Sequence, residues 1–73
     1  MLFRSTTQSA EKAFELFSKA AEQGSAEAEY WLGNAYLNGY GTEQNVLKGT
    51  EWLKKAADQG VAGAKQLLAD YLL

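Results

Sequence analysis

A five-residue segment that occurs twice is the feature that most constrains the fold of this chain. The sequence AAEQG at residues 20–24 returns as AADQG at residues 56–60, an offset of 36 residues. The same offset, without a gap, aligns further pairs along the chain: Lys12 with Lys48, Glu15 with Glu51, Lys19 with Lys55, Ala26 with Ala62, Ala28 with Ala64, and Leu32 with Leu68. Repeat periods of this size are typical of solenoids, whose units stack in a row and pack against their neighbours. We therefore expect a repeat protein.

Each unit contains two helical patterns. Ser9 and Asn45 occupy equivalent places and are good N-cap residues, and each precedes apolar residues that recur every three to four positions. Gly24 and Gly60 follow these patterns, where a helix C-terminus favours a residue in the left-handed conformation. A second pattern begins near Ser25 and again after Gly60. The sequence thus predicts four helices, at about 9–23, 26–38, 45–59 and 62–72, with one long connection over residues 39–44.

Gly33 lies inside the second predicted helix, where glycine costs about 0.5–1 kcal/mol relative to alanine. Small residues surround it in the pattern, and helices with small contact residues can approach each other closely. We expect the bare backbone of Gly33 to accommodate a bulky neighbour, Phe17 or Trp52. The equivalent residue in the next unit is Ala69. Gly33 is therefore predicted to serve packing.

The composition of the 73 residues excludes several function classes. The chain has no cysteine and no histidine, which removes disulfides, thiolate metal sites and the commonest general base. Its net charge is −2, and its lysines are interspersed with acidic residues, unlike the basic stripe of a nucleic-acid-binding protein. We expect no enzyme activity, no cofactor, no metal, and neither nucleic acid nor a membrane as a partner.

The first residues, MLFRSTTQ, do not form a signal peptide, and no segment approaches the roughly 20 apolar residues of a membrane span. The expected location is therefore cytoplasmic for the chain as given. A periplasmic or secreted location is expected instead if the chain is a fragment that has lost its signal.

Two spaced patterns resemble a known family. The first is A-x-x-x-L-G-x-x-Y-x-x-G-x-G, carried by Ala28, Leu32, Gly33, Tyr36, Gly39 and Gly41. The second is W-x-x-x-A-A-x-Q-G, carried by Trp52, Ala56, Ala57, Gln59 and Gly60. Together they resemble the Sel1-like repeat, a relative of the tetratricopeptide repeat. The chain departs from the family pattern at Thr42, Asn45, Gly49 and Leu72, where the family usually has valine, aspartate, alanine and tyrosine. Gly49 is expected to loosen the start of its helix.

The resemblance implies an all-α fold, a right-handed α-solenoid of antiparallel helix pairs. About four helices would make one full repeat and two half repeats, in a domain over residues 9–73 that follows an N-terminal arm at residues 1–8. The implied function is an adaptor that binds another protein or peptide, as is common for such repeats in bacterial proteins. Two alternatives stay open: an immunity protein of the antitoxin type that neutralises a co-encoded toxin, and a self-assembling structural fragment.

In such a solenoid the first helix of each repeat lines the concave surface. On the helix at 26–38, one stripe points away from the predicted core, and Trp31 is apolar where solvation alone would favour a polar residue. The predicted partner-binding residues on this stripe and its equivalent in the next unit are Glu27, Trp31, Asn34, Asn38, Leu67 and Asp70. The alternative for Trp31 is ordinary packing onto Tyr30 or the adjacent helix.

The ends of a short solenoid are a second candidate surface. A solenoid of fewer than about three repeats cannot cover its own terminal faces. Phe14 and Phe17 fall at one end, and Leu68, Tyr71 and Leu72 fall at the other. We expect these residues to support end-to-end self-association into a homo-oligomer, unless the chain is cut from a longer array.

Overall fold

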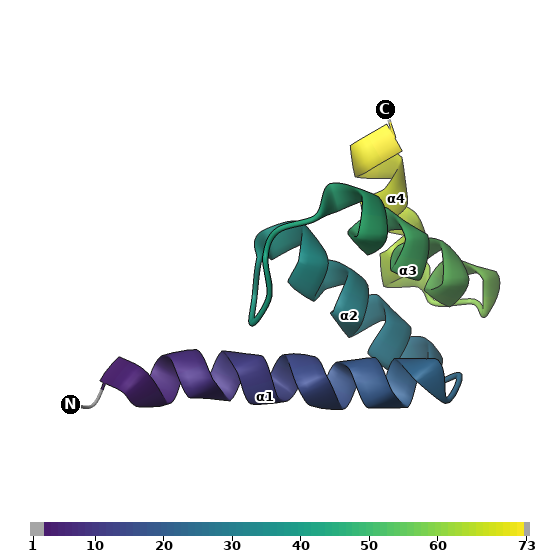
Figure 1. Cartoon of the computed structure of the whole chain (residues 1–73). Coiled ribbons are helices and arrows are strands. Elements are labelled where there is room, and N and C mark those ends of the chain that lie inside the picture. Colours follow the sequence, from purple (N-terminus) through teal and green to yellow (C-terminus); the bar gives the residue numbers. More distant parts are fainter. Residues whose placement is uncertain (1–2, 73) are drawn as a thin grey trace.

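The computed structural model describes the backbone of residues 3–72 and the side chains of residues 9–71. The chain forms four α-helices: α1 (Phe3–Glu22), α2 (Ala26–Asn38), α3 (Val46–Asp58) and α4 (Ala62–Leu72). Each helix packs against the next one along the chain, so that α2 lies between α1 and α3, and α4 lies on α3 (Figure 1). The predicted all-α helical repeat is therefore confirmed.

The caps explain where α2 and α3 begin. The Ser25 hydroxyl accepts a hydrogen bond from the Ala28 amide at 3.3 Å, and Asn45 Oδ1 accepts one from the Lys48 amide at 3.0 Å. Both bonds satisfy amides that have no partner in the first turn of a helix. At the opposite ends of α1 and α3, Gly24 and Gly60 have φ of +95° and +96°, which confirms their predicted left-handed conformation.

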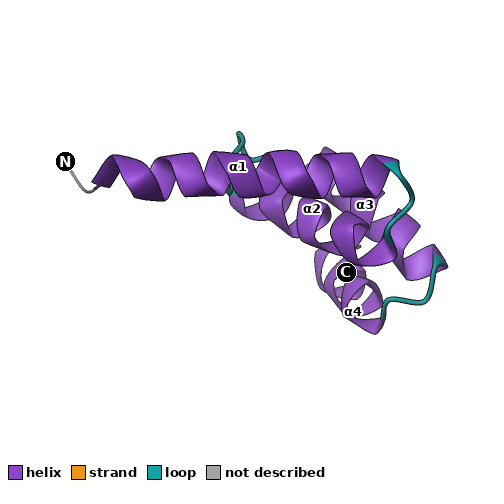
Figure 2. Cartoon of the chain, turned by 90° about the horizontal axis from the view of Figure 1, so that it is seen from below, coloured by secondary structure: helices purple, strands orange, loops and turns teal. Residues whose placement is uncertain are grey.

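The predicted start of the first helix is wrong. α1 begins at Phe3, so Ser9 lies within the helix and does not cap it. No glycine or proline occurs between Phe3 and Ser9 to end the helix, whereas Asn45 is held at its cap by a loop whose backbone bonds to α2. The N-terminal part of α1 extends beyond the other three helices (Figures 1 and 2). The predicted division between residues 8 and 9 falls inside this helix and stays a prediction.

Two clusters of buried side chains make the core. The first consists of Ala21, Ala28 and Leu32, with Phe14, Phe17, Ala20, Tyr36 and Trp52 packed against it. The second consists of Leu37, Leu53, Ala56 and Ala64, with Tyr30, Ala57, Val61, Leu67 and Leu68 packed against it. Both clusters contain residues of α2, because this helix is covered on one side by α1 and on another by α3. The core is therefore a series of interfaces between consecutive helices, as in other solenoids.

A close approach of two helices joins α2 to α3 through two glycines. A Cβ atom on Gly33 would lie 2.8 Å from Leu53 Cγ and 2.9 Å from the Gly49 carbonyl oxygen. A Cβ atom on Gly49 would lie 2.8 Å from Leu37 Cδ2 and 2.9 Å from the Gly33 carbonyl oxygen. Gly33 thus serves packing as predicted, but its neighbours are Leu53 and Gly49. The prediction of Phe17 or Trp52 in this place is wrong, because these two rings pack against the other cluster.

Two hydrogen bonds join the end of the α2–α3 connection to the last turn of α2. Gln44 Nε2 donates to the Leu37 carbonyl at 2.8 Å, and the Asn45 amide donates to the Tyr36 carbonyl at 2.8 Å. Gly41, with φ of +75°, contacts the Ala10 backbone of α1 so closely that a Cβ atom would overlap it. This loop therefore fixes α1 against the α2–α3 pair. Each helix in the described part of the chain is too short or too polar to cross a membrane.

Candidate functional site

α2 presents one exposed stripe, which we call the α2 stripe: Glu27, Trp31, Asn34 and Asn38. Glu27, Trp31 and Asn38 are exposed, and Asn34 is half-buried. An α-helix turns by about 100° per residue, so these side chains share the face opposite to the side on which Leu32 and Gly33 are buried. The structure thus brings together the four predicted residues of this helix on one accessible surface. Their role in binding stays a prediction.

Trp31 stands out on the α2 stripe because it is aromatic and yet half of its surface, 50%, is exposed. Its ring stacks on the Phe17 ring of α1, with centroids 6.4 Å apart and planes 23° apart. The Tyr30 ring meets it edge-on at 5.0 Å. The expected packing onto Tyr30 and the adjacent helix is therefore present, and it covers only part of the indole. The two ring contacts hold the exposed part of Trp31 in one orientation.

The α4 residues of the predicted site lie in two different environments. Asp70 is exposed, whereas Leu67 is half-buried against the cluster that contains Leu53. Leu67 is the repeat equivalent of Trp31, but it is less exposed than Trp31 and packs against this second cluster. Tyr30 connects the two helices, because its ring lies about 3.1 Å from where a Cβ of Gly63 on α4 would be. The α2 stripe and Asp70 are therefore the more accessible part of the predicted surface.

The predicted self-association residues are distributed between core and surface. Phe14 and Phe17 are half-buried against the first cluster, and the Phe14 ring meets the Tyr36 ring edge-on at 5.2 Å. Leu68 is half-buried against the second cluster, and Tyr71 is 46% exposed. The side chain of Leu72 lies outside the described residues. The most exposed apolar residue of α1 among those described is Leu16, at 67%.

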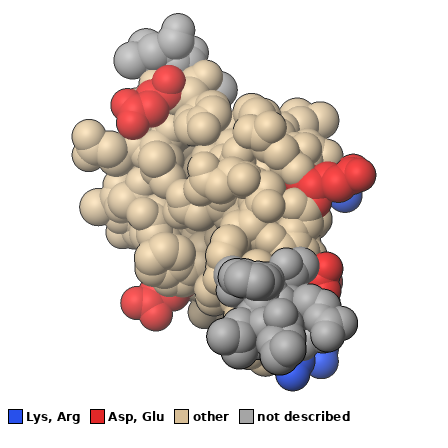
Figure 3. Space-filling model, turned by 90° about the vertical axis from the view of Figure 1, so that its left-hand side faces the viewer, with Lys and Arg blue, Asp and Glu red and all other residues tan. Residues whose placement is uncertain are grey.

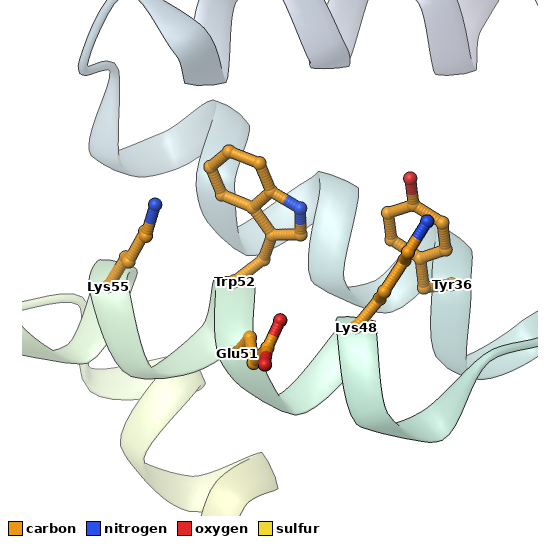
Figure 4. Close-up of a pocket in the computed structure, with 5 residues that line it drawn as sticks. All are labelled: Tyr36, Lys48, Glu51, Trp52 and Lys55. Atoms are coloured by element: carbon orange, nitrogen blue, oxygen red, sulfur yellow. The ribbon is translucent and has the colours of Figure 1, made fainter.

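A cavity lined by α2 and α3 was not predicted. It has a volume of about 290 Å³ and is lined by Tyr36, Lys48, Glu51, Trp52 and Lys55 (Figure 4). The Lys55 ammonium lies 4.5 Å from the centre of the Trp52 ring, and the Lys48 ammonium lies 5.7 Å from the centre of the Tyr36 ring. Such lysine–aromatic contacts are attractive because the ring face carries partial negative charge. We call this site the lysine–aromatic cavity.

The signal for this cavity in the sequence is the spacing of Lys48, Trp52 and Lys55. These three residues fall on neighbouring faces of one helix, but the ring of Tyr36 comes from α2 and reaches the site only through the fold. A second hollow, of about 460 Å³, is lined by residues of α1 and by one loop glycine: Glu11, Lys12, Phe14, Glu15 and Gly41. The Phe14–Tyr36 contact joins the linings of the two hollows.

Charged side chains are unevenly distributed over the surface. The face at the N-terminal end of α1 is almost free of charge in its centre, with acidic and basic groups near its edges (Figure 3). The segment that joins α2 to α3 lies at this end of the molecule (Figure 1). Among the side chains that the structure describes, no group of three histidine, cysteine, aspartate or glutamate residues is placed to hold a metal ion. The candidate surfaces thus differ in chemistry: a polar stripe on α2 with one exposed tryptophan, and a charged aromatic cavity lined by α2 and α3.

Comparison with known proteins assigns most of the chain to one family. The family model described as Sel1 repeat matches residues 1–25 and again residues 26–61. The second match begins at the first residue of α2 and includes all of α3, so it corresponds to one complete helix pair. No curated protein and no solved structure matched the chain.

Proposed function

Because this chain belongs to the Sel1 repeat family, we propose that it binds a partner polypeptide through the α2 stripe, with Trp31 as the anchor. Sel1 repeats generally mediate protein–protein interaction and are not typically enzymatic. The finer proposal, an adaptor that uses this particular face, rests on one observation. Trp31 is half exposed while two rings hold it in a defined orientation.

About half of the surface of Trp31 is exposed and can be covered by a partner. A tryptophan buries about 150–250 Å² when fully covered, so the exposed half offers on the order of 100 Å² to a partner. At about 25 cal/mol per Å², covering it contributes roughly 2–3 kcal/mol to binding. The contacts with Phe17 and Tyr30 reduce the rotamer entropy that Trp31 would otherwise lose when a partner binds. Aromatic anchors of this kind are typical binding hot spots.

The polar residues around Trp31 favour a particular partner chemistry. Glu27 and Asn38 are exposed on the same stripe, and Asp70 is exposed on α4. The charged members of the predicted site are both acidic, so a partner with an apolar side chain and neutral or basic neighbours fits it best. Polar residues at the margin of an apolar anchor are the usual arrangement in protein interfaces.

The test compares three substitutions in the immobilised chain, with retained proteins quantified by mass spectrometry. Trp31→Ala is expected to lower retention of the partner about tenfold or more, as for a hot-spot residue, and Trp31→Phe is expected to restore part of it. Leu47→Ala is the matched control, because Leu47 is 69% exposed but lies on α3. Far-UV circular dichroism verifies that all variants keep their helices. Equal losses for Trp31→Ala and Leu47→Ala, or unfolding of Trp31→Ala, would contradict the proposal.

We further propose self-association as a second function, because one exposed residue specifically favours it. Leu16 of α1 is 67% exposed, whereas Trp52, its repeat equivalent, is half-buried against the neighbouring helix pair. A second copy that covers Leu16 would restore the environment that Trp52 has. Sedimentation of the wild type and of Leu16→Glu over a range of concentrations tests this, and identical monomers in both cases would refute it.

A further inference from the structure

The lysine–aromatic cavity lies on the other side of α2 from the α2 stripe. Tyr36, which forms one wall, contacts Phe14 of α1 and lies beneath Lys48 of α3. Figure 4 shows the rings of Tyr36 and Trp52 and the amino groups of Lys48 and Lys55 on the same side of α3, directed toward α1, with Glu51 between the two lysines. The cavity therefore combines an aromatic floor with two cationic groups.

The rings and the lysines of this cavity belong to the repeated pattern of the chain. Tyr36 and Trp52 are part of the two spaced patterns, and the residues aligned with them are Leu72 and Leu16. The lysines at positions 48 and 55 also have lysine equivalents in the repeat. Among the side chains that the structure describes, the lysine–aromatic contacts are those of Lys48 with Tyr36 and of Lys55 with Trp52, and they place both ammonium groups beside a ring. The repeat thus supplies these residues, and the packing of α2 on α3 brings them together in one cavity.

The charge and spacing of the lining identify the ligand class. Two lysines and one glutamate line the cavity, a positive balance within a chain of net charge −2. Lys48 and Lys55 are seven positions apart, about 10 Å along a helix that rises 1.5 Å per residue. In an extended peptide of the polyproline II type, which has three residues per turn, side chains three residues apart share one face and are separated by about 9 Å. We propose that this cavity binds an acidic, extended peptide segment, with one carboxylate near each lysine and the intervening backbone over Trp52.

Glu51 gives this proposal a specific electrostatic signature. Glu51 lines the cavity at a position of α3 between Lys48 and Lys55, and its negative charge opposes a bound acidic peptide. Removal of its charge by Glu51→Gln is therefore expected to strengthen binding, while removal of the lysine charges weakens it. Ordinary apolar docking over Trp52 would respond to neither change. The inference is independent of the function proposed for the α2 stripe, because the two surfaces share no residue.

The experiment uses isothermal titration calorimetry on the full chain with a defined probe. The probe is a blocked octapeptide of serine and glycine that carries two glutamates three residues apart. The same peptide with glutamine in place of glutamate and inorganic phosphate at matched ionic strength are the comparison ligands. We expect saturable binding of the acidic peptide only, weakened several-fold when salt shortens the Debye length from about 10 Å toward 3 Å.

Four variants distinguish the contributions of the lining. Lys48→Gln combined with Lys55→Gln is expected to lower affinity about tenfold, and Glu51→Gln is expected to raise it several-fold. Trp52→Leu, which installs the residue of the other unit, keeps an apolar side chain for packing and is expected to lower affinity about fivefold. Lys54→Gln is the matched control for charge, because Lys54 is exposed on α3 but does not line the cavity.

Several outcomes would overturn the proposal. These are the absence of binding to wild type, equal binding of the glutamine peptide or of phosphate, and an effect of Lys54→Gln as large as that of the double lysine variant. If Trp52→Leu unfolds, the lysine and glutamate variants still decide, because their side chains are exposed. Trp31→Ala is expected to leave this binding unchanged, so failure here and failure of the α2 stripe can be told apart.

Discussion

Substitution of Gly33 by alanine tests the packing that joins the two units. The new methyl group would lie 2.8 Å from Leu53 Cγ and 2.9 Å from the Gly49 carbonyl oxygen. The Leu53 side chain can move slightly, but the carbonyl belongs to the backbone of α3, so the two helices must separate. Overpacking of a core typically costs about 1–3 kcal/mol, and the better helix propensity of alanine returns about 1 kcal/mol. Because one of the two contacts is with a backbone carbonyl, the overpacking cost lies in the upper part of its range, at about 2–3 kcal/mol, and the expected net loss is about 1–2 kcal/mol of unfolding free energy.

Urea unfolding followed by far-UV circular dichroism measures this loss, and thermal unfolding provides a second readout. For a domain of this size a loss of about 1–2 kcal/mol lowers the Tm by about 4–16 °C. Gly63→Ala is the matched control, because its new Cβ would meet only the outer atoms of the Tyr30 ring, at 3.1 Å. This control gains the same helix propensity without a backbone clash, and it is expected to keep or raise the unfolding free energy.

The reciprocal variant provides the sharper test. A Cβ on Gly49 would meet Leu37 Cδ2 at 2.8 Å and the Gly33 carbonyl oxygen at 2.9 Å, so it forces apart the same pair of helices. Once one alanine has widened the gap, the second should cost less, and the double variant should lose less stability than the two single losses combined. Stabilisation by Gly33→Ala, or strict additivity in the double variant, would refute the close approach of α2 and α3.

Three further predictions concern single hydrogen bonds and one loop contact. Asn45→Ala is expected to lower the unfolding free energy by about 1 kcal/mol in urea, because it removes the acceptor for the Lys48 amide; its repeat equivalent Ser9→Ala should leave it unchanged. Gln59→Ala is expected to cost about 1–3 kcal/mol in thermal unfolding, because Gln59 Nε2 donates to the buried Glu29 carboxylate at 3.0 Å and to the Gly24 carbonyl at 3.1 Å. Gly41→Ala is expected to free the α2–α3 loop from the α1 backbone, so limited proteolysis should cleave the loop faster than in wild type.

Much of the local structure could be predicted from the order of residues. The repeated segments at 20–24 and 56–60 indicated two equivalent helix ends, and the left-handed Gly24 and Gly60 are found there. The bounds of α2, α3 and α4 agree with the predicted ranges to within one residue at each end. These features depend on neighbours within a few positions, through caps, glycine conformations and apolar spacing, and such information is present in the sequence itself.

The start of α1 could not be predicted from the residues around Ser9 alone. Ser9 is equivalent to Asn45 in the repeat, yet only Asn45 begins a helix. The difference lies in what precedes each residue. Asn45 follows a loop whose backbone bonds to Tyr36, while the residues before Ser9 contain nothing that stops helix propagation. The family match from residue 1 agrees with a first helix that is part of the repeat.

For the candidate surfaces, too, one part could be predicted from the sequence and another part depends on the fold. A helical period of 3.6 residues placed Glu27, Trp31, Asn34 and Asn38 on one face, and this face is open in the structure. The period could not reveal that Phe17 supports Trp31 or that Leu67 is drawn toward the second cluster. Both facts depend on which residues of another helix lie opposite, and therefore on the angle and spacing of the helices.

The amino-acid order alone specified the repeat unit, three of the four helices and the exposed face of α2, because each depends on contacts between residues close together along the chain. Only the packing of the helices decided which atoms meet Gly33, how much of Trp31 is left uncovered, and that Tyr36 joins the lysines of α3 in one cavity. The physical reason is that the approach of two helices is a balance among all side chains at their interface. Here the short distance between α2 and α3 depends on Gly33 and Gly49, which face each other only in the assembled fold.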